Sequence, residues 1–211
     1  MCGRLSLFCP PGPLAERFDA TPPAHLPERY NVAPGEDLAV LRADRPDAVT
    51  WATWGFRPAG GGDRDHVNAR AETAAERPAF RDAFAERRCL VLADGFYEWT
   101  DGGQPYRVER TDGRPFAFGG LFAPGDGGAT AAVLTTSAGE VLGPVHDRAP
   151  VVLPPGDGRA WLDGADAALD PPPAGAFERY PVSQAVNDPA TDDPSVVERV
   201  AADRQGGLGE F

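Results

Sequence analysis

The first two residues offer the most specific chemistry in this chain. Cys2 follows Met1 directly, and a small side chain at this position permits removal of the initiator methionine. The mature chain would then begin with a free α-amine and a thiol on neighbouring carbons, a 1,2-aminothiol. An aldehyde condenses with such an amine to an imine, and the thiol then closes a five-membered thiazolidine ring. The pair therefore predicts a covalent aldehyde trap, although a cysteine can also follow the start codon by chance.

Composition and charge limit the class of protein. The chain has 211 residues, enough for one domain with a sizeable core. It has 32 acidic and 20 basic residues, all of the latter arginine, and a formal net charge of −12. Acidic surfaces without lysine are typical of halophiles or of GC-rich coding, and composition does not separate the two. The charge argues against a generic nucleic-acid binder, so any DNA contact needs a local arginine cluster.

The cysteine count and the hydropathy indicate the compartment. Cys2, Cys9 and Cys89 form an odd set without a repeated spacing, which indicates neither a disulfide framework nor a zinc site. No segment approaches the ~18 apolar residues of a membrane span, and no targeting segment is recognisable. We therefore expect a monomeric, cytoplasmic protein that needs no metal and no organic cofactor.

Short strands separated by turns dominate the predicted secondary structure. Alternation over residues 3–8 predicts a strand directly after Cys2. Asp101-Gly102 and Asp112-Gly113 are typical of hairpin turns between later strands. The pattern predicts the α+β class: a single domain with an antiparallel, barrel-like β-sheet and a few short helices. Residues 171–211 are rich in Pro, Asp and Gly, which predicts loose order.

Several short motifs along the chain, each weak alone, are specific in combination. They are Cys2-Gly3-Arg4, Asn31-Val32-Ala33-Pro34, Trp54-Gly55, Asn68-Ala69-Arg70-Ala71-Glu72-Thr73, Asp94-Gly95-Phe96-Tyr97-Glu98-Trp99 and His146-Asp147-Arg148. In residues and order they closely resemble the SRAP family, the SOS-response-associated peptidases or abasic-site processing proteins, here of a haloarchaeal-like kind. The resemblance implies an SRAP domain over 2–165, followed by a Pro/Asp-rich segment over 166–204. It also implies a sensor of abasic sites in single-stranded DNA that links its N-terminal cysteine to the ring-opened sugar.

The resemblance also assigns catalytic residues. An abasic deoxyribose is mostly a closed hemiacetal, so the trap needs groups that move protons to open it. Glu98 would transfer protons at the imine and the ring oxygen, and His146 would assist ring opening from the other side. Asn68 would orient the amine and the sugar for attack by Cys2. Taken alone, Glu98 also fits the polar face of a strand, His146 an ordinary loop histidine and Asn68 a helix cap.

DNA contacts are implied by the same resemblance. Arg4, Arg70 and Arg148 match the positions of phosphate contacts, and guanidinium groups suit phosphate geometry. The segment from Trp54 resembles a loop that stacks against bases near the lesion, although it continues here with glycines where relatives commonly carry another aromatic residue. In high salt a few such contacts bind feebly, so binding would depend on the covalent step and on recruitment.

The end of the chain carries a separate pattern. Gln205, Leu208 and Phe211 are spaced i, i+3 and i+6 in the terminal segment 205–211, after a polar linker. This spacing resembles the terminal peptide by which partners bind a sliding clamp. We therefore predict a clamp-binding peptide, with a frayed acidic tail as the alternative.

Three other activities remain open at this point. An N-terminal cysteine peptidase or autopeptidase would use the same Cys2, Glu98 and His146, although no oxyanion-hole motif is recognisable. A lyase would use the amine alone. A non-covalent DNA-binding module fits the negative charge poorly. The sequence favours an enzyme-like sensor in the DNA damage response that crosslinks itself to abasic single-stranded DNA.

Overall fold

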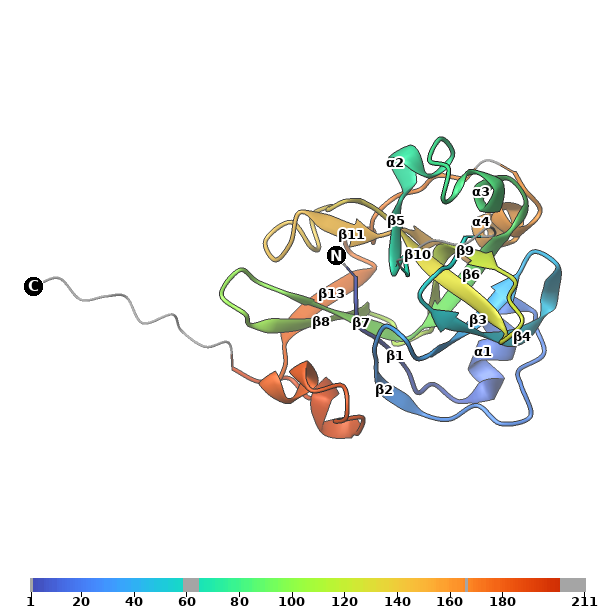
Figure 1. Ribbon diagram of the computed structural model, residues 1–211. Helices are drawn as coiled ribbons and strands as arrows, with labels where there is room; N and C mark the ends of the chain where they lie inside the picture. Colours follow the sequence, from blue (N-terminus) through green and yellow to red (C-terminus); the bar gives the residue numbers. More distant parts are fainter. Residues whose placement is uncertain (1, 59–64, 166, 202–211) are drawn as a thin grey trace, which may run out of the picture.

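Short strands and short helices follow one another along the whole chain. The computed structural model describes residues 2–58, 65–165 and 167–201, and Figure 1 shows their arrangement. The elements in chain order are β1 (Leu5–Leu7), α1 (Pro11–Phe18), β2 (Arg29–Val32), β3 (Asp37–Arg42), β4 (Arg45–Trp54), β5 (Asn68–Arg70), α2 (Ala71–Ala74), α3 (Arg81–Glu86), β6 (Arg88–Ala93), β7 (Gly95–Trp99), β8 (Pro105–Arg110), β9 (Phe116–Ala123), β10 (Ala129–Ser137), β11 (Arg148–Pro150), β12 (Val152–Leu153), α4 (Pro155–Leu162), β13 (Phe177–Pro181) and the 3₁₀ helices η1 (Gln184–Asn187) and η2 (Pro194–Val197).

One sheet closes into a barrel. β10 pairs with β9 on one side and with β4 on the other, and β3 and β6 complete the ring between them. This closure confirms the barrel-like sheet, and it leaves few free edges on which another chain could add a strand. Most pairs are antiparallel as predicted, but β10 runs parallel to both β4 and β5.

The second sheet has the strand order β13-β8-β7-β1-β2 and is antiparallel throughout. One of its faces packs on the barrel, since Leu5 and Phe96 share a core cluster with Val91 and Val133 of the barrel strands. The other face is covered by the C-terminal segment. The two sheets therefore lie against each other with the amino-terminal strand β1 between β7 and β2.

Helices cover the remaining barrel surface. Leu14 of α1 and Trp161 of α4 join a second core cluster with Leu90 and Leu92 of β6. Because alternate residues of a strand point to opposite faces, β6 contributes to both clusters, and all six of its residues are buried. Among the described residues, no helix is long and apolar enough to cross a membrane.

The two predicted hairpin turns have different outcomes. Asp101-Gly102 joins β7 to β8, which pair as neighbours, so this hairpin is confirmed. Asp112-Gly113 carries the chain from β8 in one sheet to β9 in the other, so that hairpin prediction is wrong. Local turn chemistry is the same in both cases. Only the tertiary pairing of the strands distinguishes them.

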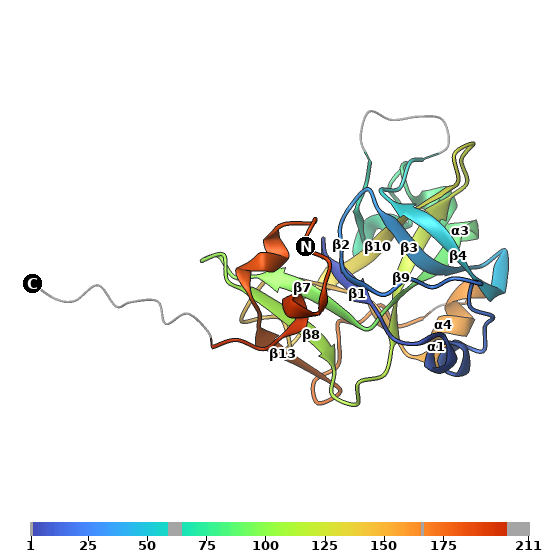
Figure 2. The ribbon, with the colours of Figure 1, turned by 90° about the horizontal axis from the view of Figure 1, so that it is seen from below.

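The prediction of loose order after residue 171 is wrong for the part of this segment that the structure describes, which ends at residue 201. β13 adds an edge strand to β8, and Val186 and Val196 are fully buried in a cluster with Tyr97. The polar residues act as caps, because Asp193 accepts a hydrogen bond from the backbone at the start of η2. Figure 2 shows this segment lying beside β7, β8 and the amino terminus.

Candidate functional site

The pairing of β1 with β7 decides which side chain lies beside the amino terminus. Leu5 lies opposite Phe96 in this antiparallel pair. In an antiparallel pair the two strands are counted in opposite directions. Two residues before Leu5 is Gly3, and two residues after Phe96 is Glu98, so the register brings Glu98 opposite Gly3. A carboxyl group is therefore placed next to Cys2 by the backbone ladder itself.

Cys2 is fully buried and is held from the barrel side. Its carbonyl oxygen accepts a hydrogen bond of 2.7 Å from Asn68 Nδ2. Asn68 begins β5, which is fixed in turn by its parallel pairing with Val133 of β10. Burial, with a smaller effect from the Glu98 charge, raises the pKa of the Cys2 thiol. Burial therefore favours the neutral thiol over the thiolate, which is the nucleophilic form.

Glu98 is the buried carboxyl group of the site, with 2% of its surface exposed. Burial raises its pKa, while the positive charge of His146 acts in the opposite direction. Glu98 and His146 are thus close enough for their charges to interact. A carboxyl group with a raised pKa can accept and return a proton nearer to neutral pH than an exposed one.

His146 is partly exposed, and its ring has a defined tautomer when neutral. Nδ1 accepts a hydrogen bond of 2.9 Å from the backbone N–H of Arg148. The same nitrogen lies 3.0 Å from the Asp147 carboxylate, but it cannot accept from one group and donate to the other at once. We favour the backbone bond because the Asp147 side chain is 87% exposed. The neutral ring then carries its hydrogen on Nε2, whereas proton transfer to a substrate requires the protonated ring.

Two of the predicted phosphate contacts flank strand β10. Arg70, which is exposed, lies opposite Thr135 on one side. On the other side Arg148 donates to the Thr135 carbonyl at 2.7 Å and forms a two-pronged ion pair with Glu72 at 2.6 and 2.9 Å. Arg4 lies on the second sheet instead, where its Nη1 donates to the Asn31 side chain at 2.8 Å. The structure thus brings Arg70 and Arg148 together and leaves Arg4 on the opposite sheet.

Trp54 does not fit the predicted role in base stacking. Its side chain belongs to the core, with 1% of its surface exposed, and its Nε1 donates to the Val67 carbonyl at 3.0 Å. A buried indole presents no face on which a base can stack. Its hydrogen bond instead fixes the residue just before Asn68, so Trp54 supports the site from behind. The adjoining residues 59–64 lie outside the described part of the chain.

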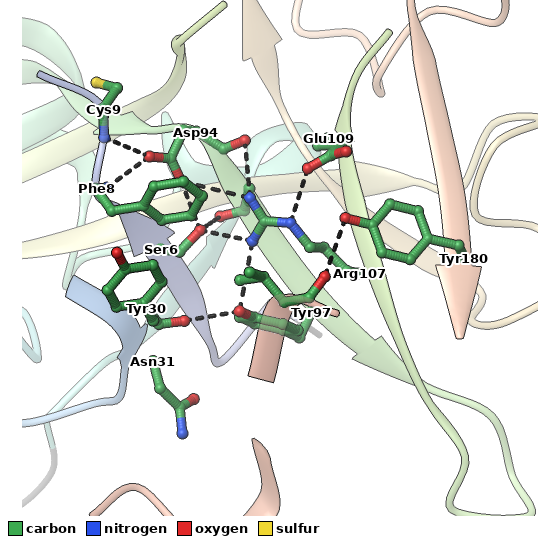
Figure 3. Close-up of polar contacts among 12 residues, drawn as sticks. Ser6, Phe8, Cys9, Tyr30, Asn31, Asp94, Tyr97, Arg107, Glu109 and Tyr180 are labelled. Carbon is green, nitrogen blue, oxygen red and sulfur yellow. Dashed lines mark hydrogen bonds and ion pairs between the residues drawn. The ribbon is translucent and has the colours of Figure 1, made fainter. Parts of the chain in front are cut away.

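A buried ion pair that the sequence did not reveal holds strand β1 in place (Figure 3). The side chains of Arg107 and Asp94 are 1% and 6% exposed and approach to 3.5 Å. Ser6 Oγ lies between them, donating to Asp94 at 2.6 Å and accepting from Arg107 at 2.7 Å. The other oxygen of Asp94 accepts the backbone N–H groups of Phe8 and Cys9. Asp94 therefore holds the far end of β1, the strand that follows Cys2 in the chain.

Gly95 has a packing role in this network. A Cβ atom at this position would lie 2.3 Å from the Arg107 guanidinium, well inside van der Waals contact. The glycine permits the close approach of the charged group to the backbone, which is a second reason for glycine besides turn formation.

Removing the carboxyl group of this ion pair is expected to destabilise the fold. Asp94→Ala removes one of the two carboxylates beside the buried Arg107 guanidinium, the other being Glu109 at 2.8 Å. It also leaves the backbone N–H groups of Phe8 and Cys9 without their acceptor, and breaking such a buried pair costs about 3–5 kcal/mol. The matched control is Asp112→Ala, which breaks an ion pair with Arg110 in which Asp112 is 42% exposed. This change should cost less than about 1 kcal/mol. Urea unfolding measures the free energy of unfolding of both variants. Equal losses in the two variants would contradict the stabilising role of the buried Asp94 carboxylate.

Several buried polar atoms at the site lack a hydrogen-bond partner among the described residues. They include Asn68 Oδ1, Arg4 Nε and Arg148 Nε, and Arg17 and Arg87 share the feature away from the site. Buried polar atoms are nearly always paired in folded proteins, so such exceptions need an explanation. The missing partners are an acceptor for each guanidinium and a donor for Asn68. A phosphate oxygen and an amine or hydroxyl group have these properties.

Comparison with known proteins identifies relatives with this architecture. The family model for the SOS response associated peptidase (SRAP) matches residues 1–189, which includes β13 and η1. The chain is 32% identical to the abasic site processing protein YoqW of Bacillus subtilis (strain 168), over 94% of this chain and 99% of that one. It is 32% identical to the abasic site processing protein YedK of Escherichia coli (strain K12), over 82% and 85% of the two chains. A solved structure from Bacteroides thetaiotaomicron has a TM-score of 0.81 at 22% identity and covers 95% of this chain, which shows the shared fold.

Proposed function

Because this chain belongs to the SRAP family, we propose that it processes abasic sites in single-stranded DNA by binding the sugar covalently through mature Cys2. The observation that carries the proposal is the gathering of four predicted residues around the amino terminus. Asn68 donates to the Cys2 carbonyl, Glu98 is placed beside it by the strand register, and His146 acts electrostatically on Glu98. These residues come from both sheets and from the loop before β11.

The proposed reaction begins with the closed sugar. A protonated His146 donates a proton to the ring oxygen and becomes neutral while the Glu98 carboxylate accepts the proton of the C1′ hydroxyl, so the hemiacetal opens to an aldehyde. The neutral α-amine of Cys2 then attacks C1′. A proton transfer through Glu98 allows one water to leave, and the imine forms.

Ring closure completes the trap. The Cys2 thiol adds to the imine carbon, its proton passes to the nitrogen, and a thiazolidine results without further loss of atoms. The raised pKa of this thiol is compatible with this order, because the imine carbon is a strong electrophile and lies within the same residue's reach. Asn68 fixes the backbone of Cys2, which limits the geometries that the amine can adopt.

The same raised pKa does not favour the peptidase that the family description records. A cysteine peptidase attacks with a thiolate, and burial beside Glu98 disfavours that form. A peptidase or a lyase activity remains testable in the same preparation, through release of peptide fragments or cleavage of the DNA strand. Either would use the residues already assigned to the sensor.

The DNA backbone would run past the arginines on β5 and β11, with Arg4 contacting it from the second sheet. In the absence of DNA, Glu72 occupies the fork of Arg148. A phosphate would take the place of this carboxylate. Lesion binding would make the protein nucleoid-associated, in agreement with the cytoplasmic location that the sequence predicts.

The direct test is incubation with a single-stranded oligonucleotide that carries one abasic site. A heat-stable adduct should appear in denaturing electrophoresis, and mass spectrometry should place it on residue 2 with Met1 absent. An adduct that survives only after borohydride treatment would indicate an imine, and hence a lyase in place of the trap.

Clamp recruitment is a separate proposal, because Gln205, Leu208 and Phe211 lie outside the described residues. Deletion of residues 205–211 is expected to abolish binding to the host's sliding clamp, since Leu208 and Phe211 would fill its apolar pocket. Surface plasmon resonance with immobilised clamp measures the loss. Adduct formation on a free oligonucleotide should not change, and unchanged clamp affinity would overturn the proposal.

A further inference from the structure

Asn31 joins the amino-terminal strand to the C-terminal segment. Its side chain is completely buried at the end of β2. Oδ1 accepts a hydrogen bond of 2.8 Å from Arg4 Nη1. Nδ2 lies within hydrogen-bond distance of three carbonyl oxygens of the C-terminal segment, those of Val186, Asp188 and Thr191, at 3.3, 3.0 and 2.8 Å. One amide group therefore connects Arg4 to a segment more than one hundred and fifty residues away in the sequence.

Residues 183–197, which we call the C-terminal brace, have further attachments to the same region. The Asp192 carboxylate accepts the backbone N–H of Asn31 at 2.8 Å and the Arg29 Nε–H at 2.5 Å. Trp99 Nε1 donates to the Asn187 side chain at 2.7 Å. In Figure 2 the brace lies beside the amino terminus and the strands that carry these residues. It is a folded part of the second sheet's outer face.

The brace also touches Arg4 directly. The Val186 carbonyl accepts from Arg4 Nη1 at 2.6 Å, so both hydrogens of this amino group are used. The guanidinium lies 5.9 Å from the centre of the Trp99 ring, whose own orientation is set by Asn187. Among the described residues none accepts from Nη2. The guanidinium is thus held in one orientation by Asn31 and the brace, with one amino group left for a ligand.

We propose that Asn31 and the C-terminal brace are positioning elements that hold Arg4 in the orientation needed to contact a DNA phosphate near Cys2. This inference rests on the proposed function, in which Arg4 contacts the backbone. A guanidinium fixed before binding loses less conformational freedom on contact than a mobile one. Three observations carry the inference. The Asn31 amide is buried, it bonds both to Arg4 and to the brace, and both Nη1 hydrogens of Arg4 are used.

The number of phosphates neutralised gives a direct test, because each contributes about 0.7 to the slope of log K against log salt for single strands. The probe is a single-stranded oligonucleotide with a tetrahydrofuran abasic analogue, which has no aldehyde and binds only non-covalently. Fluorescence anisotropy at several NaCl concentrations gives the slope for the full chain and for Arg4→Ala, Asn31→Ala and the double variant. We expect each single variant to lower the slope by about 0.7 and the double variant to show no further decrease.

The outcomes separate the inference from the proposed function. An unchanged slope in Arg4→Ala would remove Arg4 from the DNA contacts of the proposed function. A decrease in Arg4→Ala with no change in folded Asn31→Ala would overturn the positioning role. Should Asn31→Ala fail to fold, Asn31→Asp keeps the side-chain volume but places a negative charge on Arg4, and it should lower the slope similarly. The matched control is Thr111→Ala, which removes an exposed hydrogen bond to the Gly175 carbonyl outside the brace and should leave the slope unchanged.

Discussion

A Cys2→Ala variant is expected to form no heat-stable adduct with single-stranded DNA that carries an abasic site. The thiazolidine requires both the amine and the sulfur of residue 2, and alanine supplies only the amine. Cys2→Ser should likewise stop at the imine, which becomes visible when borohydride reduces it to a stable amine. Denaturing electrophoresis with and without borohydride distinguishes the thiazolidine of the wild type from the imine of either variant. Loss of the stable adduct should be complete, because no other side chain can replace a sulfur on the carbon next to the one that bears the reacting nitrogen.

The control for this variant is Cys89→Ala. Cys89 is also fully buried, and burial raises its pKa as it does for Cys2. It lies within β6, so it has no amino terminus beside it. Adduct formation should therefore persist in this variant at the wild-type level, apart from any loss of folded protein. A stable adduct in Cys2→Ala, or wild-type protein that retains Met1 and still crosslinks, would contradict the mechanism.

The sequence predicted the barrel-like α+β fold and the identity of the family because short motifs retain their order even where individual positions differ. It could not predict burial. Trp54 was expected on a stacking loop, yet it belongs to the same core cluster as Val133 of the distant strand β10. A tryptophan followed by glycine has the same local pattern in a loop and at the buried end of a strand. Only the closure of the barrel decides between them.

The buried network around Asp94 and Arg107 could not be predicted from the sequence for the same reason. Asp94 stood out in the sequence only as the first residue of a motif, whereas its carboxylate binds the backbone of residues 8 and 9 and pairs with Arg107. Such partners are far apart in the chain and no local pattern marks them. The C-terminal segment shows the converse case, because its Pro and Asp content predicted disorder although Asp192 and Asp193 satisfy backbone donors. Composition does not show which polar groups have found partners.

Substitution of Glu98 by Gln is expected to slow adduct formation by about 100-fold, the lower range for loss of a general acid–base group. Glutamine keeps the size of the side chain and its oxygen acceptor but cannot take the proton from the amine or from the C1′ hydroxyl. Single-turnover measurements of adduct against time give the rate. Cys2 is unchanged, so the adduct that does form should still be a thiazolidine.

The pH profile should change in a characteristic way. Burial raises the pKa of Glu98, and the α-amine, with a reference pKa of ~7.7–8.0, must also lose its proton before it attacks. Below both values the logarithm of the wild-type rate should rise by about two for each pH unit, since two groups must deprotonate. The variant should rise by about one, because only the amine remains. The matched control, Glu178→Gln, removes a carboxyl group that is 43% exposed on β13 and should leave the profile unchanged.

The Glu98→Gln substitution should raise the stability of the fold at neutral pH although it lowers the rate of adduct formation. Since the folded-state pKa of Glu98 lies above its unfolded value, the folded state binds more protons than the unfolded state between the two. The free energy of unfolding of the wild type therefore falls as pH rises through this window. Glutamine has no proton to lose, so Glu98→Gln should remove this dependence and raise the melting temperature at neutral pH relative to the wild type. Thermal unfolding at pH 5 and at pH 8 measures the difference. A Glu98→Gln variant that is slower but also less stable at neutral pH would show that the Glu98 carboxylate stabilises the fold. The buried charge of Glu98 would then not lower the free energy of unfolding, and the idea that this loss of stability is retained for catalysis would be wrong.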